Sequence, residues 1–183
     1  MDKDRIIKRL LDIGAVKKGR FRLSSGRESD IYIDLRLVPS HPSVFRLIIE
    51  HLFLEFYGLL KKKSALVGVA TGGISWATAL AYRAGLPAGY VRPKRKEYGL
   101  SRRVELDERV TDSVILVDDV ATTGKSLADA IDVLREEGII VDTALVIVDR
   151  NEGAQELLRE KGAHLYSLLS LDNIRRLLDG LEH

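Results

Sequence analysis

The sequence predicts a single α/β domain built on a central parallel β-sheet flanked by helices. From about residue 61 onward, short apolar segments alternate with segments whose apolar residues recur at helical spacing. The short segments are continuously apolar, as in 114–117, which is typical of parallel strands that helices cover on both faces. A chain of 183 residues has the size of one domain, so we treat 1–183 as one unit.

The composition excludes several classes of protein. Cysteine is absent, which excludes disulfides, thiolate metal sites and a Cys nucleophile. The 29 basic and 27 acidic residues give a net charge of +2, and this balance offers no general attraction to nucleic acid or to a membrane surface. No apolar run approaches the roughly 20 residues of a membrane span, and the charged start lacks the apolar stretch of a signal peptide. We therefore expect a cytoplasmic protein without nucleic-acid or membrane partners.

The first 60 residues do not follow the strand–helix alternation. A helix is predicted where Ile6, Ile7, Leu10 and Leu11 recur at helical spacing. We expect this part to cap the edge of the sheet at which ligands bind. Its predicted elements are a helix at 4–13, two short strands at 21–23 and 31–35 around a polar turn, and a helix from Pro42 to about 57.

Residues 61–170 supply the predicted core sheet, and one more helix follows it. The crossovers between parallel strands are expected to be right-handed, with ligands at the carboxyl ends of the strands. Strands are predicted at 65–70, 88–91, 114–117, 139–148 and 164–168, followed in turn by helices that end at about 84, 137, 161 and 178, the strand at 88–91 alone having none.

The most informative stretch is 114–126, in which Asp118 and Asp119 directly follow a buried strand. Burying two acids without partners costs several kcal/mol, so a cation or a hydroxyl-rich ligand is their natural complement. The next turn, Ala121–Ser126, offers two Thr hydroxyls, a glycine and successive backbone N–H groups at a helix start. Such a turn binds phosphate. Acids beside a phosphate site together predict a sugar phosphate as ligand.

Two alternatives for this stretch were weighed. Helix capping would explain Ser126 or Thr123, but it would not explain two acids directly after the strand. The tail Gly124-Lys125-Ser126 also matches a nucleotide-binding Walker A loop. That motif requires glycine where Asp119 stands, and a carboxylate there would repel a triphosphate. The sugar-phosphate interpretation is therefore favoured.

A second turn, Thr71-Gly72-Gly73, follows the first core strand. The dinucleotide-binding pattern fails here, because the next strand ends at Arg92 rather than at an acid for a ribose hydroxyl. A nucleophile elbow around Ser75 also fails, because its last position is not glycine. By itself the turn is a weak signal, and an ordinary structural turn is the alternative.

The segment 92–109 contains seven Arg or Lys residues and four acids. A solvated hairpin is the ordinary interpretation of such a segment. A loop of this length without an apolar core is, however, often an active-site lid. Next to a phosphate site, its cations are suited to stabilise charge on a leaving group.

The stretch 114–126 resembles the phosphoribosyl-diphosphate signature of the type I phosphoribosyltransferases. Members of that family have a parallel sheet, a small N-terminal hood and a flexible lid, and they use Mg²⁺. The resemblance implies a hood within 1–60 and a lid at about 92–109. It narrows to the orotate-specific branch of the family through four further segments: 21–27 with 32–34, 91–99, 148–153 and 161–171.

Residue by residue, the resemblance implies the following roles. Arg92, Lys96 and Tyr98 would hold the diphosphate with the turn at Thr71 and Gly72, and Lys96 would reach the neighbouring subunit's site in a homodimer. Asp118 and Asp119 would bind the ribose hydroxyls and orient hydrated Mg²⁺ through water. The 5′-phosphate would be wrapped by Val120, Ala121, Thr122, Thr123, Gly124, Lys125 and Ser126, and orotate would be contacted by Thr122, Arg150 and Ser24.

Four positions depart from the family pattern. Many members have Lys at the positions of Ser24 and Pro93 and His at that of Tyr98, and some have Lys at that of Gly72. Tyr98 can donate a hydrogen bond but is not a cation near neutral pH.

The activity implied is Mg²⁺-dependent transfer of ribose 5-phosphate from phosphoribosyl diphosphate to orotate, with Lys96, Asp118 and Asp119 as the catalytic residues. Arg150 is a suitable cation for a carboxylated pyrimidine. Two alternatives stay open: a transferase for another base such as a purine, and a regulator that binds phosphoribosyl diphosphate without turnover.

Overall fold

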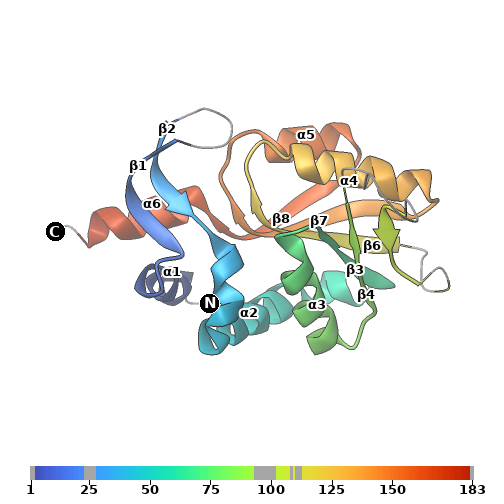
Figure 1. Cartoon of the computed structure of the whole chain (residues 1–183), viewed down its shortest axis with the longest axis horizontal. Coiled ribbons are helices and arrows are strands. Elements are labelled where there is room, and N and C mark those ends of the chain that lie inside the picture. The colour runs from blue at the N-terminus through green and yellow to red at the C-terminus, as the bar shows by residue number, and fades with distance from the viewer. Residues whose placement is uncertain (1–2, 23–27, 93–101, 108, 110–112, 182–183) are drawn as a thin grey trace.

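The computed structural model describes residues 3–22, 28–92, 102–107, 109 and 113–181. Its centre is a six-stranded sheet with the order β5-β4-β3-β6-β7-β8 (Figure 1). All neighbours are parallel except β4 and β5. The strands are β3 (Ala65–Val69), β4 (Ala88–Val91), β5 (Val104–Glu105), β6 (Ser113–Ala121), β7 (Ile140–Asp149) and β8 (His164–Ser170).

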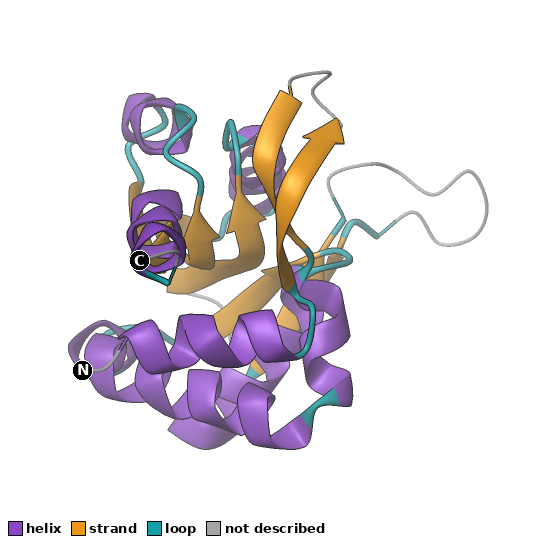
Figure 2. Ribbon diagram, turned by 90° about the vertical axis from the view of Figure 1, so that its left-hand side faces the viewer, coloured by secondary structure: helices purple, strands orange, loops and turns teal. Residues whose placement is uncertain are grey.

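Helices cover both faces of this sheet, as its continuously apolar strands require. One face packs against α1 (Lys3–Asp12), α2 (Pro42–Leu60) and α3 (Gly73–Ala84), and the other against α4 (Lys125–Glu136) and α5 (Ala154–Glu160) (Figure 2). Alternate residues of β6 serve the two cores: Ile115 and Val117 face the α2 side, whereas Val114 and Leu116 face the α4 side.

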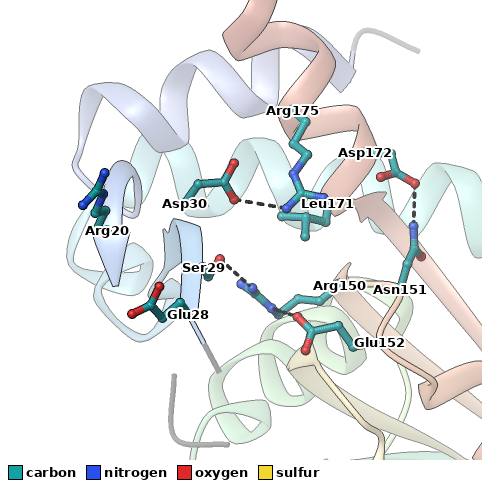
Figure 3. Close-up of a pocket in the computed structure, with 10 residues that line it drawn as sticks. All are labelled: Arg20, Glu28, Ser29, Asp30, Arg150, Asn151, Glu152, Leu171, Asp172 and Arg175. Carbon is teal, nitrogen blue, oxygen red and sulfur yellow. Dashed lines mark hydrogen bonds and ion pairs between the residues drawn. The ribbon is translucent and has the colours of Figure 1, made fainter. Parts of the chain in front are cut away.

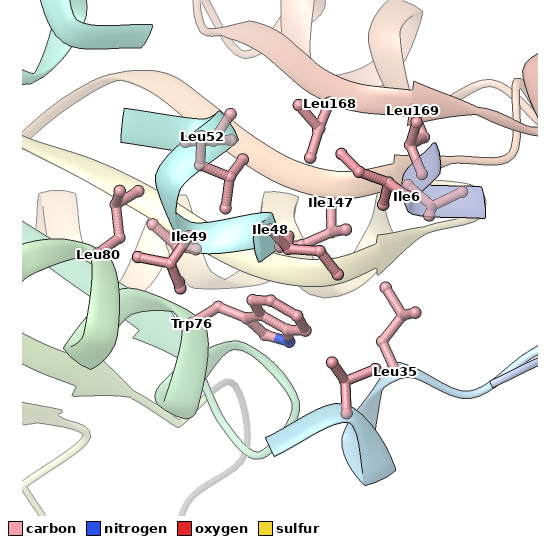
Figure 4. Close-up of a cluster of buried hydrophobic side chains, with 14 of the residues drawn as sticks. Ile6, Leu35, Ile48, Ile49, Leu52, Trp76, Leu80, Ile147, Leu168 and Leu169 are labelled. Atoms are coloured by element: carbon pink, nitrogen blue, oxygen red, sulfur yellow. The ribbon is translucent and has the colours of Figure 1, made fainter. Parts of the chain in front are cut away.

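The core on the α2 side is the larger of the two. Trp76 of α3 is fully buried there beside Ile48 and Ile49 of α2 (Figure 4). The ring of Phe45 meets the Trp76 ring edge to face, with centroids 4.9 Å apart. This core fixes α2 and α3 against the sheet, and with them the turn that precedes α3.

The N-terminal hairpin stands apart from the main sheet. Its strands, β1 (Val16–Arg22) and β2 (Glu28–Ile33), are antiparallel, and the 3₁₀ helix η1 (Leu35–Ser40) leads from it into α2. Within the first 60 residues, the helices α1 and α2 thus cover one face of the sheet. The hairpin reaches the carboxyl end of β7, where its β2 strand contacts Arg150.

The predicted α/β class is confirmed. Every predicted helix and strand of the core is present, β4 with the predicted bounds and most of the others with ends shifted. The prediction that β6 ends before the two acids was wrong. β6 continues to Ala121, because its pairing with β7 extends to the partners Ala121 and Asp149. The sequence analysis did not predict η1 or β5. Within the described residues, no helix is long and apolar enough to cross a membrane.

Candidate active site

The order of the parallel strands determines where a ligand crevice forms. From β3 the chain moves outward to β4, and it then returns past β3 to add β6, β7 and β8 on the other side. In sheets of this type, ligands bind outside the carboxyl ends of the two strands at which the direction reverses. Here those strands are β3 and β6, and they end at the two turns that the sequence singled out.

The turn after β3 touches the acids of β6. A Cβ atom built on Gly72 would lie 2.6 Å from Oδ2 of Asp119, so only glycine allows this approach. A Cβ atom on Gly73 would collide with the carbonyl oxygen of Val117. The backbone of this turn therefore packs directly against β6. The Ala70–Thr71 peptide within the turn is cis.

Asp118 and Asp119 lie within β6 and are held by local hydrogen bonds. Oδ1 of Asp118 accepts from the backbone N–H of Asp119 at 2.9 Å, and Oδ1 of Asp119 accepts from that of Val120 at 2.8 Å. Burial, reinforced by the charge of Asp119, raises the pKa of Asp118 well above its ordinary value. Burial also raises the pKa of Asp119. Two carboxylates in such surroundings favour a cation or hydroxyl donors as ligand.

Arg36 is a nearby cation that the sequence analysis did not assign. Its Nε and Nη2 donate to Oδ1 and Oδ2 of Asp34, each at 2.8 Å. The Arg36 side chain stays 67% exposed, and its positive charge partly offsets the rise in the pKa of Asp119 that burial causes. The only sequence signal for Arg36 was its neighbour Asp34, which lies in the resembling segment 32–34. The bidentate pairing of Asp34 with Arg36 is visible only in the folded chain.

The turn after β6 forms a cavity of about 270 Å³. Gly124 adopts a left-handed backbone, with φ of +78°, immediately before α4, and no side chain caps this helix. The helix-capping alternative for Thr123 and Ser126 is therefore not supported. Uncapped N–H groups at a helix start bind anions. The cavity is lined by Asp118, Val120, Ala121, Thr122, Thr123, Gly124, Lys125, Ser126 and Leu127.

Arg150 follows β7 and lines a second cavity, of about 700 Å³ (Figure 3). Its backbone N–H donates to the carbonyl oxygen of Ala121 at 2.9 Å. Its side chain is 5% exposed and is bound by Glu152 of the same turn and by Ser29 of β2. The start of the phosphate turn and the predicted base-binding arginine are thus fixed to each other.

The remaining predicted site residues lie elsewhere or outside the described residues. The Arg92 side chain donates to Glu105 at 3.2 Å and to the hydroxyl of Tyr90 at 2.8 Å, at the β4–β5 edge of the sheet. Thr71 is exposed at the turn after β3. Ser24, Pro93, Lys96 and Tyr98 are outside the described residues, as is most of the predicted lid.

Comparison with known proteins agrees with this geometry. The sequence matches the phosphoribosyl transferase domain family over residues 41–173. A protein of Aeropyrum pernix called orotate phosphoribosyltransferase is 50% identical over 162 residues, which are 88% of this chain and 86% of that protein. The crystal structure of orotate phosphoribosyltransferase from Aeropyrum pernix has a TM-score of 0.84 and 45% identity, with 95% of this chain and 99% of that chain covered.

A more distant neighbour is the Mycobacterium tuberculosis orotate phosphoribosyltransferase in complex with phosphoribosyl diphosphate. Its TM-score is 0.74 at 28% identity, with 95% of this chain and 99% of that chain covered. The fold and the paired turns at β3 and β6 therefore define an enzyme of the phosphoribosyltransferase class. Within that class, this chain belongs to the orotate phosphoribosyltransferase family.

Proposed function

We propose that this protein transfers ribose 5-phosphate from phosphoribosyl diphosphate to orotate, giving orotidine 5′-phosphate and pyrophosphate, in the synthesis of UMP. The observation that carries the proposal is the bond between Arg150 N–H and Ala121 O, because it joins a phosphate-binding turn to an arginine suited to a carboxylated base. The names of the relatives point to the same substrates.

In this proposal, phosphoribosyl diphosphate lies across the carboxyl ends of β3 and β6. The turn Ala121–Ser126 binds the 5′-phosphate through backbone N–H groups and the hydroxyls of its side chains. Asp118 and Asp119 accept hydrogen bonds from the ribose hydroxyls. The turn at Thr71 and Gly72 holds the diphosphate together with Arg92. To do so, Arg92 must break its hydrogen bond to Glu105 and bind the diphosphate instead.

The acid pair fits Mg²⁺ that is held jointly with the ligand. Within 3–22, 28–92, 102–107, 109 and 113–181, no group of three or more His, Asp or Glu side chains is placed to hold a metal ion. Asp118 is buried and Asp119 half-buried, and burial raises the pKa of both, so a nearby cation would offset the cost of ionising them. They would orient hydrated Mg²⁺ through water. When bound, Mg²⁺ neutralises charge on the diphosphate and so makes it a better leaving group.

The bond that breaks joins the anomeric carbon to the diphosphate oxygen, and the bond that forms joins that carbon to a ring nitrogen of orotate, whose N–H proton passes to the departing pyrophosphate or to water. Pyrophosphate departs as the sugar gains oxocarbenium character, and attack from the opposite face inverts the configuration. Arg150 and Thr122 hold orotate, with Ser24 as a third contact. Positioning of the two substrates is the main contribution of these residues.

The lid and the dimer complete the proposal. Lys96 would reach from the lid of one subunit into the site of its partner and stabilise charge on the departing pyrophosphate. This role comes from the family resemblance of 91–99, and a homodimer is required for it.

Orotate consumption tests the proposal and is followed by ultraviolet absorbance with phosphoribosyl diphosphate and Mg²⁺. Parallel reactions offer uracil, adenine, hypoxanthine and xanthine, at moderate and at elevated temperature, and a chelator control removes Mg²⁺. We expect turnover only when the base is orotate, and we expect the chelator to abolish that turnover. Turnover with another base instead would refute the orotate assignment. Binding of phosphoribosyl diphosphate without turnover of any base would favour a regulator.

A further inference from the structure

The guanidinium of Arg150 is held from two directions by segments far apart in the sequence. Its Nε donates to Oε1 of Glu152 at 2.8 Å, and its Nη2 donates to Oγ of Ser29 at 3.0 Å (Figure 3). A longer contact of 3.4 Å joins Nη1 to the carbonyl oxygen of Ile31. A guanidinium has five N–H groups. These three contacts fix its plane and leave two N–H groups for a ligand.

The hydroxyl of Ser29 is itself oriented. Its oxygen donates to the carbonyl oxygen of Ile31 at 2.9 Å and accepts from the backbone N–H of Ile31 at 3.2 Å. A serine hydroxyl has one hydrogen, so toward Arg150 it acts as an acceptor. The hairpin thus presents a fixed acceptor to an arginine that lies 121 residues later in the chain.

The turn that carries Arg150 and Glu152 is equally restrained. Oδ1 of Asp149 accepts from the backbone N–H of Asn151 at 2.9 Å. Asn151 has a left-handed backbone, with φ of +55°, and its Nδ2 donates to Oδ2 of Asp172 on α6 (Leu171–Gly180) at 2.8 Å. Asn tolerates this conformation better than most other non-glycine residues. The turn therefore fixes the backbone of Arg150, while Glu152 and Ser29 fix its guanidinium.

We propose that Glu152 and Ser29 are positioning residues that pre-orient Arg150 for the carboxylate of the substrate base. This inference rests on the proposed function, in which Arg150 binds orotate. The arginine side chain is long and adopts many rotamers. Fixing it before the ligand arrives therefore lowers the entropic cost of binding. The Glu152 carboxylate also offsets the buried charge of the guanidinium, which is 5% exposed, in the absence of substrate.

The test separates the Michaelis constants for the two substrates in Glu152→Ala, Glu152→Gln and Ser29→Ala. A glutamine oxygen can still accept from Nε of Arg150, so Glu152→Gln is the conservative rescue. Glu50→Ala is the matched control, because Glu50 likewise accepts from the Nε of an arginine, Arg83, at 2.8 Å, but lines neither cavity of the site. Melting temperatures of all variants report on folding.

We expect Glu152→Ala to raise the KM for orotate by roughly tenfold while the KM for phosphoribosyl diphosphate stays within about twofold, since a misplaced binding group impairs only its own ligand. Ser29→Ala should shift the same constant in the same direction, and Glu152→Gln should restore most of the loss. Glu50→Ala should leave both Michaelis constants as in the wild type.

Three results would overturn the inference. An unchanged orotate KM in Glu152→Ala is the first, and equal losses in Glu152→Ala and Glu152→Gln, which would indicate charge rather than position, are the second. The third is a parallel rise in both Michaelis constants with a lower melting temperature, which would indicate a structural role. The proposed function is judged separately, from turnover of orotate by the wild type.

Discussion

The backbone of Gly72 lies against the carboxylate of Asp119, so that a Cβ atom at Gly72 would stand 2.6 Å from both Cγ and Oδ2 of that side chain. The two residues follow or belong to different strands, β3 and β6, at the reversal point of the sheet. Glycine at this turn therefore sets the position of an acid of the site.

Gly72→Ala is expected to impair activity more than stability. The added methyl group forces the Asp119 carboxylate to rotate away, and a displacement of about 1 Å at a reacting site can cost roughly 100-fold in rate. Steady-state kinetics with both substrates and a melting curve measure the two effects. Gly58→Ala on the exposed side of α2 is the control, because nothing lies within 4 Å of its Cβ position. Equal activity in both variants would contradict the expectation.

Asp118→Asn is expected to abolish turnover and yet to stabilise the ligand-free protein near pH 7, by on the order of 1 kcal/mol. The raised pKa of Asp118 means that the folded state binds the proton more tightly than the unfolded state. Its stabilising effect is therefore complete below the unfolded pKa and is lost as pH rises through the folded pKa. Asparagine keeps the acceptor for Asp119 N–H without the charge.

Thermal melting of Asp118→Asn and the wild type across pH 4–9 checks this sign. Asp142 gives the opposite case, since its pKa is lowered by the bond from Lys63. Its contribution is present above the unfolded pKa and is lost as pH falls through the folded pKa. A wild type whose stability rises with pH relative to Asp118→Asn would refute the assignment of the buried acid.

Gly124→Ala is expected to weaken binding of phosphoribosyl diphosphate, and Gly138→Ala is its matched control. Both glycines have a left-handed backbone, with φ of +78° and +80°, which costs an alanine about 1–2 kcal/mol. Only at Gly124 would the Cβ also press on Ala154, at 2.9 Å from its Cα. The KM for phosphoribosyl diphosphate should rise in Gly124→Ala alone, whereas both variants lose stability. A similar KM in the two variants would count against the phosphate site.

Arg36→Met is expected to move the acid limb of the pH–rate profile to higher pH. Burial raises the pKa of Asp119, and the positive charge of Arg36 offsets part of that rise. Its removal therefore lets that pKa rise, and the ionised form of Asp119 appears only at higher pH. Profiles of kcat/KM for phosphoribosyl diphosphate measure the shift. Arg83→Met, which removes a cation bound to Glu50 on α2, should leave the profile unchanged. An unshifted limb in Arg36→Met would exclude this electrostatic role.

Lys96→Ala is expected to lower turnover strongly without changing the melting temperature, if the lid serves the partner's site. Mixing this variant with Asp119→Asn then offers a sharper measurement. Hybrid dimers would contain one site with an intact acid pair and an intact lid, so that activity returns in part. Mixtures that stay as inactive as the separate variants would refute a site shared between subunits.

The strand–helix order and the phosphate turn could be predicted from the sequence because both are local patterns. Apolar runs define β3, β6 and β7, and the residues of 121–126 carry their own chemistry. The end of β6 could not be predicted, since the acids look like a strand terminus and only the ladder with β7 carries the strand to Ala121. Pairing between strands depends on the whole sheet.

Contacts between distant segments account for the other gaps. Glu152 lies within the resembling segment 148–153 and Ser29 lies between the resembling segments 21–27 and 32–34, but neither had a role until the fold placed them on either side of Arg150. Arg36 was likewise unassigned, because its importance depends on the proximity of η1 to β6. Helix and strand periodicity carries no information about such pairs.

The hydrogen bond from Arg150 N–H to Ala121 O has a consequence for selectivity. It ties the support of the 5′-phosphate to the support of the base by one peptide contact of 2.9 Å. In the proposed function, this contact fixes the distance between the 5′-phosphate and the base, and so selects a nucleoside monophosphate of that length. Lengthening the turn after β6 by a single residue would change this distance. A ligand of the natural length would then reach either the phosphate turn or Arg150, but not both.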